Sequence, residues 1–168
     1  MAGILRRREQ SKNVSRQGLT EPRTIGGIAG MALVAALYVA HAMLLKATGH
    51  GLGAPWLLLL VLPGALAAYI SRRQGEKYNP EREGAQAGLL TAHFAAILQV
   101  VVLVIGVLSV DWPAYDAQVG SEIGDSVHAM AVPATAVAVV VLIAVTYTGC
   151  ILASWLGAIA CTKVMNYK

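Results

Sequence analysis

The feature that most constrains this chain is the stretch from Gly84 to Ser109, which contains no Asp, Glu, Lys or Arg. A helix crosses the hydrocarbon core of a bilayer with about 20 predominantly apolar residues, and this stretch is longer than that. The composition agrees with a membrane protein. Of the 168 residues, 57% are hydrophobic and only 13% are charged, whereas a soluble domain has about 25% charged residues.

The apolar residues occur in four long runs rather than in the half-polar pattern of soluble helices. We therefore predict an all-α integral membrane protein, a four-helix transmembrane bundle with one domain at 25–168 and a basic arm at 1–24. The approximate spans are 25–47, 55–71, 84–110 and 133–162. Pro63 and Gly64 lie within the second run, so we expect a kink there.

Positive charges are distributed unevenly between the predicted spans. Six Lys and Arg residues precede the first span, four lie in 72–83 and two in the C-terminal tail, whereas the other connections have only Lys46. The positive-inside rule therefore places both termini in the cytoplasm, and we expect a bacterial-type inner membrane. The arm suits anionic lipid headgroups or a partner subunit, and the basic residues need no nucleic acid to explain them.

Small residues recur every fourth position in the third and fourth spans, and four residues of an α-helix turn through about 400°. Each set therefore forms one stripe along its helix, where another backbone can approach closely. Antiparallel packing matches the two stripes in depth and also brings Gln99 opposite Thr146. We expect a hydrogen bond between these two side chains and a packing seam made by Gly84, Gly88, Ala92, Ala96, Gln99, Thr146, Gly149, Ala153, Gly157 and Cys161.

Two histidines fall within predicted spans, His41 in the first and His93 in the third. An ionisable residue within a membrane helix is a candidate functional residue, and neutral imidazole can ligate haem iron. By our depth count, His41 lies about 24 Å and His93 about 13 Å from the cytoplasmic edge. This mismatch disfavours a shared haem but leaves single ligation of a haem or chlorophyll-type pigment open, and the identity of any cofactor stays open.

Motifs for chemistry are missing from the sequence. We find no nucleophile–base pair, no phosphate-binding glycine loop and no zinc spacing, and every Asp and Glu lies outside the apolar runs. We therefore expect a non-catalytic accessory or scaffolding subunit that binds other integral membrane subunits. The alternatives are a small transporter or channel subunit that uses the kinked second span and Gln99, and a tetrapyrrole-binding subunit that uses His41 or His93.

The charge distribution makes a direct prediction about topology. A cysteine introduced at Gln118, in the connection between the third and fourth spans, should react with a membrane-impermeant thiol reagent added outside the cell. A cysteine at Gln74, in the basic connection, should react only after the membrane is permeabilised. The opposite labelling pattern would invert the topology.

Overall fold

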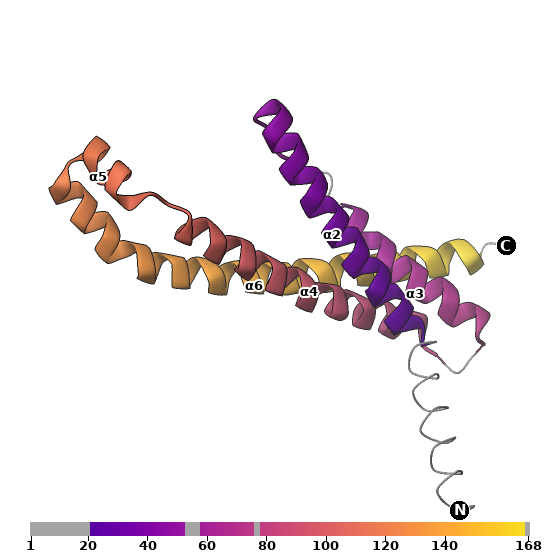
Figure 1. Cartoon of the computed structure of the whole chain (residues 1–168). Helices are drawn as coiled ribbons and strands as arrows, with labels where there is room; N and C mark the ends of the chain where they lie inside the picture. Colours follow the sequence, from indigo (N-terminus) through magenta and orange to yellow (C-terminus); the bar gives the residue numbers. More distant parts are fainter. Residues whose placement is uncertain (1–20, 53–57, 76–77, 167–168) are drawn as a thin grey trace, which may run out of the picture.

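A computed structural model describes residues 21–52, 58–75 and 78–166, and all its regular secondary structure is helical (Figure 1). The predicted all-helical class is therefore confirmed for these residues. Most of the basic arm, 1–20, lies outside them. In chain order the helices are α2 (Pro22–Thr48), α3 (Val61–Arg73), α4 (Pro80–Leu108), α5 (Trp112–Val119) and α6 (Ser121–Asn166).

Three helices are long and apolar enough to cross a membrane: α2, α4 and the part of α6 from Asp125 to Asn166. Helix α3 has 13 residues and is therefore about 20 Å long, which is less than the roughly 30 Å of a bilayer core. The fourth span stays a prediction, because residues 53–57 before α3 are outside the described part of the chain.

The helices share one end, which we call the packed end. There α2 begins, α3 ends, α4 begins and α6 ends. The backbone N–H of Arg23 on α2 donates to Glu83 on α4 at 3.1 Å, and Arg72 on α3 donates to Asn166 on α6 at 2.7 Å. At the opposite, open end, α2 and α4 finish and α5 packs beside the first turns of α6.

Helix α4 is the centre of the packed end and uses two faces. Gly84, Gly88, Ala92 and Ala96 are all buried on one face, as the spacing predicts. A side chain at Gly88 would meet the Cys150 carbonyl and the Ser154 side chain of α6, both 2.7 Å from its Cβ position. The second face packs on α2, because Ala87 lies opposite Gly26 and Thr91 lies opposite Gly30.

Helix α3 fits between α2, α4 and α6 through its own small residues. The Cβ position of Gly64 is occupied by backbone atoms of Ser154, so the two backbones touch directly. The predicted kink stays a prediction, because α3 begins at Val61 directly after a 3₁₀ turn at 58–60, and residues 53–57 lie outside the described part of the chain. Pro63 falls in the first α-helical turn, where proline is tolerated.

The stripe on α6 also differs from the prediction. Gly149 is exposed, and no atom lies within 4 Å of its Cβ position, while Gly157 packs against Val61 of α3 rather than on α4. The buried residues of α6 include Cys150, Ser154 and Ala158 as well as the predicted Gly157. Helix α6 contacts both α3 and α4, so its buried face is broader than one stripe and is shifted by one residue.

The start of α6 corrects a further prediction. The predicted fourth span begins at 133, but the connection before it contains α5 and the first turns of α6, and Pro133 lies inside that helix. The chain reverses at Gly120, whose φ of 88° suits glycine. Proline removes one backbone bond, but the sequence around it is rich in alanine, the strongest helix former, and this favours continuation.

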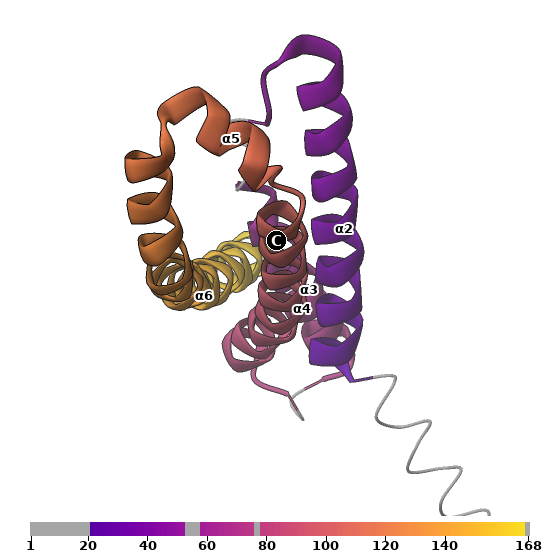
Figure 2. The same ribbon diagram turned by 60° about the vertical axis from the view of Figure 1, so that its left-hand side comes forward.

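Helix α2 separates from the other helices toward the open end (Figure 1). Figure 2 shows its far half apart from α5 and the first half of α6. Among its buried residues, Val34 is the last along the helix, and every residue from Val39 to Thr48 is exposed. The helices therefore form a splayed arrangement, with close packing at one end only.

The glycine contacts provide a matched pair of substitutions. Gly88→Ala places a methyl group against the α6 backbone and should lower the free energy of unfolding by about 1–3 kcal/mol. Gly149→Ala meets open space and should be neutral or stabilising by up to about 1 kcal/mol, the gain in helix propensity. Reversible unfolding in detergent measures both values. Equal effects would mean that α4 and α6 do not approach at Gly88.

Candidate functional site

Three polar side chains meet between the long helices, and we call them the three-helix polar node: Tyr38 of α2, Gln99 of α4 and Thr146 of α6. The Thr146 hydroxyl lies 2.7 Å from Gln99 Oε1 and 2.7 Å from the Leu142 carbonyl. The Tyr38 side chain lies close enough to Gln99 for the two polar groups to interact. The structure thus contains the Gln99–Thr146 contact expected from the sequence and adds a third helix.

The position of the node explains its role in the fold. Gln99 lies 19 residues after Pro80, so it is about 29 Å along α4 from the packed end. Tyr38 immediately precedes the exposed half of α2, which begins at Val39. The node is therefore the point at which α2 leaves the bundle. Its three groups are neutral hydrogen-bonding side chains, which can fix helix positions or hold a neutral polar group.

His41 has a structural partner in the chain that returns from α2. Its Nδ1 accepts a hydrogen bond from the backbone N–H of Leu52 at 3.0 Å, and a side chain at Gly51 would collide with the imidazole ring. Residues 50–52 are not helical, so their N–H groups lack helical partners. An unpaired backbone donor is costly in hydrocarbon. We therefore assign His41 a structural role, which is to accept the hydrogen bond of the Leu52 N–H.

His93 has a different environment at the middle of α4. Its Nδ1 lies 2.8 Å from the Leu89 carbonyl, one turn earlier. Its ring makes an edge-on contact with Tyr147 of α6, with centroids 5.0 Å apart and planes at 65°. The side chain is exposed. The two candidate ligands are therefore not equivalent, because they lie on different helices and use Nδ1 in opposite ways.

Glu83 is a structural residue that the sequence reasoning placed in a charged loop. It is only 7% exposed and lies in the first turn of α4. It also accepts the Arg23 N–H in the first turn of α2, so one carboxylate lies near two helix N-termini, where negative charge is favourable. The local signal was Asn79–Pro80, since Asn79 caps α4 by accepting from the N–H groups of Glu81 and Arg82.

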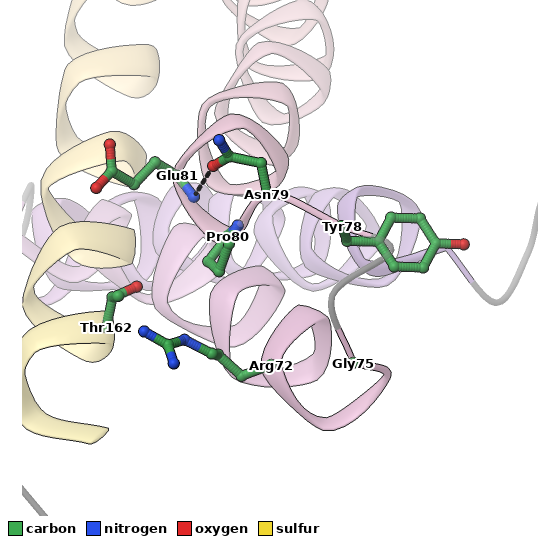
Figure 3. A pocket seen from close by; sticks show the side chains of 7 residues that line it. All are labelled: Arg72, Gly75, Tyr78, Asn79, Pro80, Glu81 and Thr162. Carbon is green, nitrogen blue, oxygen red and sulfur yellow. Dashed lines mark hydrogen bonds between the residues drawn. The ribbon is translucent and has the colours of Figure 1, made fainter. Parts of the chain in front are cut away.

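The cavities with described linings open at the packed end. The larger has a volume of about 670 Å³, and Figure 3 shows the Arg72 guanidinium extending toward Thr162, while Tyr78 points away. It is lined by Arg72, Gly75, Tyr78, Asn79, Pro80, Glu81 and Thr162. A smaller one of about 330 Å³ includes Arg23 and Arg82. Both linings mix cations with carboxylates, and neither includes a predicted site residue.

Within the described ranges, no three His, Cys, Asp or Glu side chains lie close enough to hold a metal ion together. The chain matches no protein-family model, no curated protein sequence and no solved structure.

The polar node can be tested with a double-mutant cycle. Gln99→Met and Thr146→Val should show a coupling free energy of about 0.6 kcal/mol, with an upper value near 1.7 kcal/mol, as for hydrogen bonds between membrane helices. Thr148→Val is the matched control, because Thr148 is exposed on the same turn of α6 and should show no coupling with Gln99. Equal coupling for both threonines, measured by unfolding in detergent, would contradict the contact.

Proposed function

We propose that this chain is a non-catalytic accessory or scaffolding subunit of a larger membrane complex. In this proposal the open end binds transmembrane helices of another integral membrane subunit. The observation that carries it is that every residue of α2 from Val39 to Thr48 is exposed. A peripheral helix within a bundle normally has one face toward lipid and one face toward its neighbours, whereas the contacts of this half of α2 come from the returning residues 50–52.

Unused small-residue surfaces support the same proposal. Gly106 on α4 and Gly149 on α6 have no atom within 4 Å of their Cβ positions. Small residues are enriched where membrane helices approach closely, and at the packed end the glycines Gly64, Gly88 and Gly157 all serve this purpose. The two unused glycines are therefore surfaces on which a helix of another subunit can pack.

The distribution of charge supports an orientation with the packed end in the cytoplasm. The basic residues there are Arg23, Arg72, Arg73, Arg82 and Lys163, whereas Lys46 is the one described Lys or Arg at the open end. Helix α2 begins and α6 ends at the packed end, as two cytoplasmic termini require. In this orientation the basic residues contact anionic headgroups, worth about 1 kcal/mol each near the surface, in a bacterial-type inner membrane.

The alternative of a transporter or channel subunit has less support. Pro63 lies in the first turn of α3, where proline is tolerated. Gln99 accepts a hydrogen bond from Thr146 of α6 and is not among the residues that line the described cavities. We therefore prefer the accessory role to this alternative.

Site-specific photo-crosslinking tests the accessory role in the native membrane. A photoreactive amino acid replaces Met43, which is 68% exposed at the open end of α2, and crosslinked products are identified by mass spectrometry. We expect a discrete adduct with one other membrane protein. Leu156 is the matched control, because it is 54% exposed near the packed end of α6 and should form only lipid adducts. Lipid adducts alone at both positions would overturn the proposal.

A further inference from the structure

His93 has an exposed position that the fold does not explain. It lies 13 residues after Pro80 and 15 before Leu108, so it is about 20 Å from either end of α4. Ionisable residues at this depth almost always face the protein interior or a water-filled cavity. The His93 side chain instead lies on the outside of the described structure, next to the exposed apolar residues Leu89 and Ile97.

The contacts of His93 define which ring nitrogen carries the proton. A carbonyl oxygen only accepts hydrogen bonds, so the 2.8 Å contact with Leu89 requires a proton on Nδ1. In the neutral ring, Nε2 then has a free lone pair. No hydrogen bond within the described part of the chain uses this atom. An acceptor left without a partner in hydrocarbon is unfavourable, so an external group at Nε2 would stabilise this arrangement.

The arrangement is the one that metal-ligating histidines adopt. Such histidines donate one ring N–H to a carbonyl or carboxylate, which fixes the tautomer and the ring orientation and raises the basicity of the other nitrogen. Leu89 supplies that carbonyl, and the edge-on ring of Tyr147 packs against the imidazole from α6. Nδ1 is therefore held by the Leu89 carbonyl, and Nε2 is left for a ligand that approaches from outside α4.

His41 provides the contrast within the same chain. Its Nδ1 accepts the Leu52 N–H, so in the neutral ring the proton is on Nε2. That nitrogen has no lone pair available for a metal, and Nδ1 is already occupied. Ligation by His41 would require the loss of a backbone hydrogen bond in the segment that returns from α2.

We propose that His93 Nε2 is the axial ligand of a metal tetrapyrrole that lies against the exposed faces of α4 and α6. The macrocycle supplies four nitrogens, so a single imidazole from the protein is sufficient, as in haem proteins with one proximal histidine. Leu89 and Ile97, 38% and 65% exposed, form an apolar surface beside the ligand. The shared chemistry is a square-planar metal with an open axial position, either iron in haem or magnesium in a chlorophyll.

Titration of the full-length protein in detergent tests this proposal, with haemin and chlorophyll a as separate probes. We expect a saturable one-to-one shift of the Soret band with haemin or of the red band with chlorophyll, and the responding probe identifies the metal. His93→Ala should weaken this binding at least tenfold, and added imidazole should restore the spectrum. His41→Ala is the matched control and should bind like the unmodified chain.

Circular dichroism of each variant shows whether it is folded, which keeps a loss of binding at His93 interpretable. Binding that His93→Ala leaves unchanged would show nonspecific partition into the detergent and would overturn the proposal, as would the failure of both probes to bind the unmodified chain. The accessory role uses the open half of α2, so crosslinking at Met43 and tetrapyrrole binding at His93 can fail independently.

Discussion

The structure depends on direct backbone contact between helices at the packed end. Gly64 of α3 touches the backbone of Ser154 on α6, and Gly88 of α4 contacts the side chain of the same Ser154 and the carbonyl of Cys150, one turn earlier. Hydrocarbon provides no hydrophobic force between helices, so close van der Waals contact and interhelical hydrogen bonds have to hold them together. Larger side chains at these glycines would remove that contact, which makes the glycines indispensable to the arrangement.

The remaining features follow from packing at one end only. The described residues 50–52, which return from α2, are not helical, and His41 pairs one of their N–H groups. Glu83 joins the starts of α2 and α4, and the three-helix polar node marks the far limit of the contacts of α2. Beyond the node, the chain offers apolar and small-residue surfaces without partners of its own, and the proposed subunit contact uses these surfaces.

The sequence predicts those parts of the fold that depend on one helix at a time. The stripe from Gly84 to Ala96 was identifiable because its spacing of four matches the helical repeat, and the Gln99–Thr146 contact followed from depth counting. The buried face of α6 was not predictable in this way. This face contacts two helices. Gly149 and Cys150 are both small enough for close helix packing, so the sequence alone does not show which of them is buried. The positions of α3 and α4 decide it.

Other differences have equally local causes. A proline indicates a kink only when the helix is known to continue before it, and the α-helical part of α3 begins only two residues before Pro63. The sequence also does not show which ring nitrogen of His41 and His93 carries the proton. In His41 this is set by Leu52, which is eleven residues away along a returning chain, and in His93 by the i−4 carbonyl of Leu89. Residue type alone suggests both histidines as metal ligands, whereas their hydrogen bonds leave a nitrogen lone pair available only on His93.

The central claim is that α2 and α4 are close at the packed end and diverge toward the open end. Double electron–electron resonance in lipid nanodiscs tests it most directly, with Cys150 and Cys161 replaced by alanine. Spin labels at Ile28 and Leu89 report the packed end, and labels at Met43 and Val104, each 15 residues further along its helix, report the open end. We expect a clearly longer and broader distance distribution for the second pair. Equal distances for the two pairs would mean that α2 runs alongside α4 over its whole length, which would contradict the splayed arrangement.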